Sequence, residues 1–275
     1  MTGLEHISAA FAAAKDENRA ALMPYHTLGY PTREASLEVI SAIAEARADL
    51  IELGLPFSDP LADGPTIQHS TQVALENGTT IRDCLEMVRQ LRGAGLTQPF
   101  LLMGYTNPIL SFGKEKFVTE ASRAGADGLI IPDLPVEEAG ELESACCEHG
   151  LALIYLVAPT TPLERLAQVT AHSTGFVYIV SLTGVTGARK EVSADLETFL
   201  GRVRSVTDKP LAVGFGISTP EQAARVGKMA EGVIVGSALI DVVGKAADPA
   251  QAAGKFIASL GDGLRGRIIN SHSYS

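Results

Sequence analysis

The chain has 275 residues, of which 46% are hydrophobic and 20% are charged, a balance that supplies ample apolar material for a globular core. Its formal net charge of −10 argues against nucleic-acid binding, which needs a basic face, but allows a phosphorylated substrate, because backbone N–H groups alone can hold an anion. The three cysteines, Cys84, Cys146 and Cys147, are odd in number and two are adjacent, which indicates a reducing compartment and not a disulfide framework.

The first 20 residues mix charged side chains such as Glu5, Lys15 and Arg19 with short apolar steps. They predict a short amphipathic helix and not a signal peptide. No run of about 18 apolar residues occurs anywhere in the chain, so we expect no membrane span. The protein is expected to be soluble and cytoplasmic, or to lie in the plastid stroma if it comes from a plant.

Short apolar runs rich in β-branched residues alternate with helical patterns along the rest of the chain. Eight strands are predicted, over residues 21–27, 49–53, 99–103, 128–131, 151–157, 175–180, 211–214 and 232–235. Eight helices are predicted to follow them, over residues 33–46, 80–92, 115–124, 136–149, 162–171, 193–206, 219–226 and 250–260. The strands are apolar at successive positions, as expected when helices cover both faces of a parallel sheet.

A strand followed by a helix, repeated eight times, predicts a (β/α)₈ TIM barrel, because open parallel sheets usually have fewer strands. No linker, low-complexity tract or charge block divides the chain. We therefore expect one domain over residues 1–275, with an extra N-terminal helix and a frayed tail at about 270–275. Barrels of this kind place their chemistry on the loops that follow the strands.

The most informative segment begins in the second predicted strand and continues through a loop rich in proline and glycine. Glu52 lies between Ile51 and Leu53 in that strand, where a carboxyl group is costly unless it has a purpose. Partial burial would raise its pKa towards neutrality, which suits a general acid or base. A structural glutamate bonded to a neighbouring loop is the alternative that the residues leave open. Asp59 and Asp63 follow on the loop, where each could either serve the site or cap a turn.

Glycine-rich segments follow each of the last three predicted strands. They span residues 181–187, 214–218 and 236–240, and Gly236 with Ser237 could open a short extra helix. Glycines let the backbone approach an anion, and a helix N-terminus offers free N–H groups. Barrels frequently bind phosphate after strands seven and eight. One glycine cluster is a weak signal because turns use glycine anyway, but three on consecutive strand ends predict a phosphate site.

The placement of lysine and histidine narrows the chemistry. A Schiff-base aldolase needs a lysine at a strand end, and none of the lysines is predicted there. A metal-dependent enzyme needs a cluster of histidine or carboxylate ligands, whereas only His26 lies near the end of a predicted strand. Pyridoxal phosphate would also need such a lysine as its anchor, so the sequence predicts no site for it. The residues therefore favour acid–base catalysis by carboxyl groups, with no metal.

The run from Glu52 to Gln68, ELGLPFSDPLADGPTIQ, closely resembles the signature of the tryptophan synthase alpha subunit family. The resemblance runs in order from about residue 4 to about residue 260, with few changes of length. It also includes residues 101–103, 132–138, 184–187, 214–218 and 236–237, together with Tyr178. The signature run is long and highly specific.

The resemblance implies a lyase of tryptophan biosynthesis that cleaves indole-3-glycerol phosphate to indole and D-glyceraldehyde 3-phosphate in a retro-aldol reaction. It assigns the proton transfers at indole C3 and at the glycerol hydroxyl to Glu52, and the stabilisation of charge on the indole ring to Asp63. Tyr178 would position Glu52 or the substrate, and Tyr25 would pack near indole unless it is simply a core tyrosine. The other substrate-binding residues that the resemblance implies are Thr186, Gly187, Gly214, Gly216, Gly236 and Ser237.

The family also has a mobile loop after the sixth strand, here about residues 182–194, which closes over the substrate. Its partner is a pyridoxal-phosphate-dependent beta subunit in an α₂β₂ heterotetramer, which receives indole through an internal tunnel. Contacts with that subunit are expected near residues 56–60, 107–108 and 133–136. The resemblance implies no cofactor in this chain, because pyridoxal phosphate belongs to the beta subunit alone.

Three other functions remain to be weighed. Another phosphate-binding barrel, such as an indole-3-glycerol phosphate synthase or a ribulose-phosphate epimerase, would need the strand-end lysines or metal ligands that are missing here. A lyase that releases indole without a partner would have the same catalytic residues. A non-catalytic activator of the beta subunit would have no need of both Glu52 and Asp63.

Overall fold

The structure, a computed structural model, describes residues 1–180, 191–214 and 216–266. Strand segments form one sheet in the order β5-β4-β3-β2-β1-β9-β8-β7-β6, and every neighbouring pair is parallel. The segments are β1 (Ala21–Thr27), β2 (Ile51–Gly54), β3 (Phe100–Met103), β4 (Gly128–Ile130), β5 (Ala152–Ile154), β6 (Leu156–Val157), β7 (Val177–Val180), β8 (Leu211–Gly214) and β9 (Gly232–Val235).

The sheet closes into a barrel at Tyr155. This residue alone separates β5 from β6, which are the two ends of the strand order, so the fifth predicted strand is present as two short pieces. The Tyr155 N–H donates to the Ser173 hydroxyl and not to a neighbouring strand, whereas its carbonyl accepts from Tyr178 N at 3.0 Å. The predicted TIM barrel is confirmed, with each predicted strand within two residues of its expected bounds.

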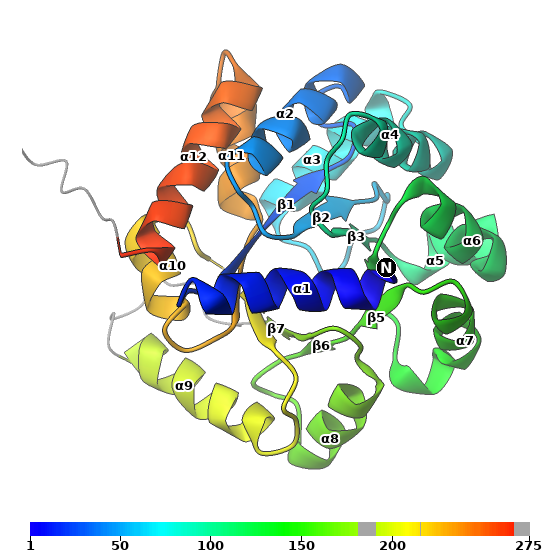
Figure 1. The fold of residues 1–275 in the computed structure, drawn as a ribbon. Coiled ribbons are helices and arrows are strands. Elements are labelled where there is room, and N and C mark those ends of the chain that lie inside the picture. The colour runs from blue at the N-terminus through cyan, green and yellow to red at the C-terminus, as the bar shows by residue number, and fades with distance from the viewer. Residues whose placement is uncertain (181–190, 215, 267–275) are drawn as a thin grey trace, which may run out of the picture.

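Helices surround the barrel, and α1 crosses the middle of their ring (Figure 1). Their bounds are α1 (Gly3–Asp16), α2 (Arg33–Glu45), α3 (Pro65–Glu76), α4 (Ile81–Gly93), α5 (Thr106–Phe112), α6 (Lys114–Ala124), α7 (Gly140–Glu148), α8 (Leu163–His172), α9 (Glu191–Arg204), α10 (Pro220–Val226), α11 (Ser237–Lys245) and α12 (Pro249–Leu264), with a 3₁₀ turn, η1 (Val136–Glu138). The extra N-terminal helix and the short helix that begins after Gly236 are both present as expected.

Two helices, α3 and α5, lie where we predicted only loops, and the predicted helix over residues 136–149 is divided into η1 and α7. Helix α3 starts with a proline at its first position, a favourable helix start, but the polar run that follows weakens its apolar pattern. Helix α5 has 7 residues, which is too short for a helical period to show in the sequence. The tail at 270–275 lies outside the described residues.

The interior of the barrel and the closed end under it form one apolar cluster. Ile7 and Phe11 of α1 pack there against Met23 and Leu101, which point inward from β1 and β3. The rings of Phe11 and Phe176 lie 5.6 Å apart between centroids. Helix α1 therefore seals the end of the barrel at which the strands begin, which leaves the opposite end for a site.

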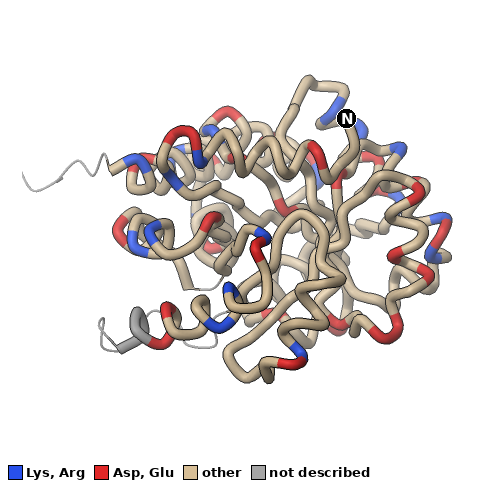
Figure 2. Tube along the Cα trace, turned by 60° about the horizontal axis from the view of Figure 1, so that its bottom comes forward, with Lys and Arg blue, Asp and Glu red and all other residues tan. Residues whose placement is uncertain are grey.

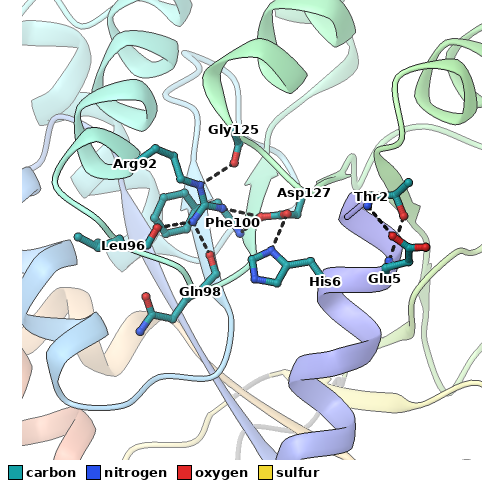
Figure 3. A network of polar contacts seen from close by, with 9 residues as sticks. All are labelled: Thr2, Glu5, His6, Arg92, Leu96, Gln98, Phe100, Gly125 and Asp127. Carbon is teal, nitrogen blue, oxygen red and sulfur yellow. Dashed lines mark hydrogen bonds and ion pairs between the residues drawn. The ribbon is translucent and has the colours of Figure 1, made fainter.

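A polar network fixes α1 to this closed end (Figure 3). Asp127, just before β4, accepts from Arg92 Nη2 at 2.6 Å and from the N–H of Phe100 at 2.7 Å. Its other oxygen lies 2.8 Å from Nδ1 of His6 on α1. The Arg92 guanidinium stacks over the Phe100 ring at 3.8 Å. One carboxylate thus ties together α1, α4, β3 and β4.

Charged side chains are spread around the outside of the barrel. Figure 2 shows Lys and Arg interspersed with Asp and Glu along the tube, and not gathered on one face in that view. Among the described residues, no helix combines the length and apolarity that crossing a membrane would require.

Candidate active site

A cavity of about 330 Å³ opens at the carboxyl ends of the strands, within the size range of small-molecule sites. It brings together residues that lie far apart in the sequence. The predicted site residues that line it are Tyr25, Glu52, Asp63, Tyr178, Gly214, Gly216, Gly236 and Ser237. Thr186 and Gly187 lie outside the described residues, as does segment 182–190 of the predicted mobile loop, whereas residues 191–194 belong to the start of α9.

Glu52 is a fully buried carboxyl group that points into this cavity. It lies in β2 between Tyr25 of β1 and Leu101 of β3 in the strand register, and its exposed fraction is 0%. Neither carboxyl oxygen has a hydrogen-bond partner among the described residues. Burial, and then the nearby charge of Asp63, raise the pKa of Glu52 to about 8. The group therefore holds a proton at neutral pH that no atom of the described residues accepts in a hydrogen bond.

Asp63 is held by contacts at both its side chain and its backbone. The Tyr105 hydroxyl donates to Asp63 Oδ2 at 2.9 Å, and the same hydroxyl accepts from the N–H of Ala62 at 3.0 Å. Gln68 Nε2 donates to the Asp63 carbonyl at 2.8 Å. Burial raises the pKa of Asp63, and the bond from Tyr105 opposes that rise. Asp59, the other candidate on this loop, is exposed and does not line the cavity.

Tyr105 is a part of the site that sequence reasoning missed. It follows β3 directly, at the end of the barrel where such sites lie, and its ring packs 5.4 Å from that of Phe57 between centroids. An aromatic residue just past a strand end was the available signal. Its contact with Asp63 spans 42 residues and becomes visible only once the strands are closed into a barrel.

Tyr25 of β1 and Tyr178 of β7 both line the cavity, and glycines make room for both. A Cβ atom at Gly54 would lie 2.1 Å from the Tyr25 hydroxyl, and one at Gly214 would lie 2.7 Å from that of Tyr178. Burial is the main cause that raises the pKa of both phenols, and both therefore stay neutral. Gly214 thus has a packing reason beside the anion contact that the sequence suggested.

The last two strand ends differ in the backbone N–H groups they leave free. At α10 a glutamine side chain occupies them, because Gln222 Oε1 accepts from the N–H of Ser218 at 2.8 Å. At α11 no side chain caps the helix within the described residues, and Gly236 and Ser237 line the cavity. Gly216 nearby has a φ of +70°, which favours glycine. The N-terminus of α11 is therefore available to an anion in the cavity.

The described lining of the cavity is acidic. Its described lining contains the carboxyl groups of Glu52, Asp63 and Asp241 and has no Lys, Arg or His. No three His, Cys, Asp or Glu side chains of the described residues come together as ligands for a metal ion. The arrangement offers one carboxyl group whose pKa is raised to about 8, a second carboxyl group held by a tyrosine, and an uncapped helix start. It suits proton transfer on a substrate that carries an anionic group.

Comparisons with known proteins agree with this geometry. The family described as tryptophan synthase alpha chain matches residues 11–264. The tryptophan synthase alpha chain of Chloroflexus aggregans is 55% identical over 238 residues, covering 86% of this chain and 89% of that protein.

Solved structures agree as well. Tryptophan synthase subunit alpha from Legionella pneumophila superposes with a TM-score of 0.88 at 38% identity, covering 97% of this chain and 99% of the other. A chain of Mycobacterium tuberculosis tryptophan synthase gives 0.87 at 40% identity, covering 94% and 98%. The chain belongs to the tryptophan synthase alpha chain family.

Proposed function

We propose that Glu52 and Asp63 divide the chemistry of the reaction between them, one moving protons and the other holding a developing charge. The reaction itself is that of the family: the chain is a lyase of tryptophan biosynthesis that cleaves indole-3-glycerol phosphate to indole and D-glyceraldehyde 3-phosphate. The observation that carries the proposed division is the buried Glu52 carboxyl, which points into the cavity without a hydrogen-bond partner in the described part of the chain.

The proton steps follow from the protonated state of Glu52. The bond between the ring and the glycerol chain breaks only after indole C3 is protonated, because the ring then accepts the electron pair. Neutral Glu52 donates that proton and becomes a carboxylate. The carboxylate then takes the proton of the hydroxyl on the adjacent carbon as the C–C bond breaks and the aldehyde forms. Glu52 ends the cycle protonated, as it began.

Asp63 acts on the charge that the first step creates. Protonation at C3 places positive charge on the indole ring and its nitrogen, and an ionised carboxylate that accepts a hydrogen bond from the ring N–H stabilises it. The hydrogen bond from Tyr105 favours the ionised form of Asp63 against the effect of burial. Among the described residues only Asp63 has a hydrogen-bond donor, and this difference in environment suits two carboxyl groups in one cavity to different roles.

We assign the phosphate of the substrate to the part of the cavity away from the two carboxyl groups. It would bind at Gly216, Gly236 and Ser237, with Thr186 and Gly187 completing the site. The uncapped start of α11 supports this assignment, since it offers backbone N–H groups and the favourable end of the helix dipole. No Lys, Arg or His side chain of the described residues lines the cavity, so none of them could bind the phosphate in place of the backbone N–H groups.

We further propose that the chain works in the cytoplasm with a pyridoxal-phosphate-dependent beta subunit, in an α₂β₂ assembly, and passes indole to it. The alpha-chain family supports the existence of such a partner. We assign no cofactor to this chain, because the proposed steps need only the two carboxyl groups. The expected contact segments, near residues 56–60, 107–108 and 133–136, lie around the same end of the barrel as the cavity.

Replacement of the two carboxyl groups tests the division of labour. Glu52→Gln should lower kcat for indole release by about 100- to 10,000-fold, because the amide cannot transfer protons. Asp63→Asn should lower kcat by about 100- to 1,000-fold, because it removes the charge that stabilises the ring cation. Both variants should still bind glycerol phosphate in a calorimetric titration.

Asp59→Asn is the matched control, because it makes the same charge change on the same loop outside the cavity. It should keep the wild-type rate. Turnover close to wild type in Glu52→Gln, or an equal loss in Asp59→Asn, would contradict the assignment.

A further inference from the structure

A chain of three hydroxyl groups joins strand β1 to helix α3 behind the cavity wall. The Tyr25 hydroxyl lies 3.2 Å from Thr27 Oγ1, and Thr27 Oγ1 lies 2.7 Å from Ser70 Oγ. Ser70 Oγ in turn donates to the carbonyl of Ile67 at 2.8 Å. Thr27 and Ser70 have exposed fractions of 0%, so no solvent competes for these hydrogen bonds.

Counting protons gives the chain a direction. A hydroxyl group carries one proton, and that of Ser70 goes to the Ile67 carbonyl, which has none to give. Ser70 therefore accepts from Thr27, and Thr27 accepts from Tyr25. Every proton in the chain is committed, and each link depends on the next. Removing one hydroxyl leaves a buried donor or acceptor unpaired, which is costly.

The end of this chain lies next to Asp63. Ile67, whose carbonyl closes the chain, is in the first turn of α3 and lines the cavity. The next residue, Gln68, donates to the Asp63 carbonyl at 2.8 Å. Asp63 itself stands two residues before the start of α3. The position of its backbone therefore depends on where α3 sits against β1.

We propose that Thr27 and Ser70 are positioning residues for the reaction: their hydroxyl groups seat α3 on β1 and thereby place Asp63 against the substrate. This inference rests on the role of Asp63 proposed above. Tyr105, just before α5, holds the side-chain carboxyl group of Asp63, while the hydroxyl chain holds the backbone of Asp63 from β1 through α3. Neither Thr27 nor Ser70 lines the cavity, so each acts through α3 and not by touching substrate.

The first test separates positioning from substrate binding. Thr27→Val and Ser70→Ala each remove one hydroxyl, and each should lower kcat by about 5- to 50-fold, because displacements near 1 Å can cost up to about 100-fold. The affinity for glycerol phosphate should stay within about twofold of wild type, because the anion is held at the other end of the cavity. Thr27→Ser keeps the hydroxyl and should retain most of the wild-type kcat.

The second test asks whether the effect passes through Asp63. Single-turnover indole release, with enzyme in excess, is measured for wild type, Ser70→Ala, Asp63→Asn and the double variant. If Ser70 acts by placing the Asp63 charge, Ser70→Ala should lower the rate by less than about twofold in the Asp63→Asn background. Thermal unfolding confirms that each variant is folded at the assay temperature.

The results that overturn the proposal are distinct from those that overturn the function. Equal losses from Ser70→Ala in both backgrounds would show that the hydroxyl chain acts independently of Asp63, and wild-type kcat in both Thr27→Val and Ser70→Ala would show that it does not act on catalysis. If the affinity for glycerol phosphate fell together with kcat, the hydroxyl chain would support the fold in general and would not specifically position Asp63. A wild-type chain that releases no indole would overturn the proposed function, and this inference with it.

Discussion

At the scale of single residues, Glu52 combines two properties that a structural side chain does not need. It is buried, and both of its oxygens lack partners in the described part of the chain. Burying an unpaired polar group costs stability, and a glutamine or an apolar residue would be cheaper in the same place. In return for this loss of stability, the chain has a carboxyl group that keeps its proton at neutral pH beside the cavity.

The pH dependence of the reaction follows from that proton. Because the first step needs protonated Glu52 and its pKa is raised to about 8, kcat/KM should fall as pH rises through about 8. Above that value the fall should approach tenfold per pH unit. A pH–rate profile between pH 6 and 10 checks this, and a rate that stays constant to pH 10 would show that the ionised form begins the reaction.

The same shift predicts an effect on stability. The pKa of Glu52 is higher in the folded chain than the ordinary glutamate value of 4.5, so the folded state binds the proton more tightly, and stability declines as pH rises from 4.5 to about 8. Glu52→Gln lacks this decline. It should therefore be more stable than wild type at pH 7, by up to about 3 kcal/mol, and the gain should shrink towards pH 4.5.

Urea unfolding of both proteins at several pH values between 4.5 and 8 measures the difference. A gain that does not change with pH would mean that packing, and not the proton, causes it. The variant thus links activity and stability: the change that removes the proton transfer is the change that stabilises the fold.

At the scale of secondary-structure elements, the two ends of the barrel differ in what their polar networks do. At the closed end, the Asp127 network ties α1 to α4, β3 and β4, far from the cavity (Figure 3). At the open end, the loop before α3 is held by Tyr105 and Gln68, and these contacts hold Asp63 in the lining of the cavity. Substitutions in the Asp127 network should therefore change stability without changing catalysis.

Asp127→Asn tests the closed end. The change removes the charge that pairs with the partly buried Arg92, and breaking such a pair is strongly destabilising, here by about 3 kcal/mol. Indole release per folded molecule should stay at the wild-type value, because the network does not reach the cavity. Urea unfolding together with a steady-state assay below the melting temperature gives both quantities.

Glu86→Gln is the control, because it removes one of the two carboxylates that pair with Arg89, an exposed contact at 3.3 Å for which about 0.5 kcal/mol or less is expected. A loss of kcat in Asp127→Asn without a loss of stability would contradict the separation of the two ends.

At the scale of the whole molecule, the alternation of apolar runs and helical patterns was enough to predict the barrel, because each strand is buried on both sides and reads as a continuous apolar run. The place of Glu52 in the second strand was enough to predict a buried carboxyl with a raised pKa. What the sequence could not show were contacts between residues brought together by closure. Tyr105 reaches Asp63, and Thr27 reaches Ser70, across 42 and 43 residues respectively.

Helix α3 escaped prediction for a related reason. Its buried face includes the polar residues Ser70 and Thr71, so it has no clear apolar stripe in the sequence. Of these two residues, Ser70 is buried because its hydroxyl belongs to the chain that connects α3 to β1. The expected apolar stripe is absent from α3 because this helix packs against β1 partly through polar groups. Such departures from ordinary core packing are expected next to a functional site.

We propose that this chain cleaves indole-3-glycerol phosphate with its own two carboxyl groups. The most direct test is to measure the release of indole and D-glyceraldehyde 3-phosphate by the purified chain and by Glu52→Gln, each with and without a beta subunit. We expect equimolar products from the wild-type chain, a faster rate with the beta subunit, and almost none from Glu52→Gln in either condition. Absence of indole from the wild-type chain in both conditions, or equal release by the two proteins, would contradict it.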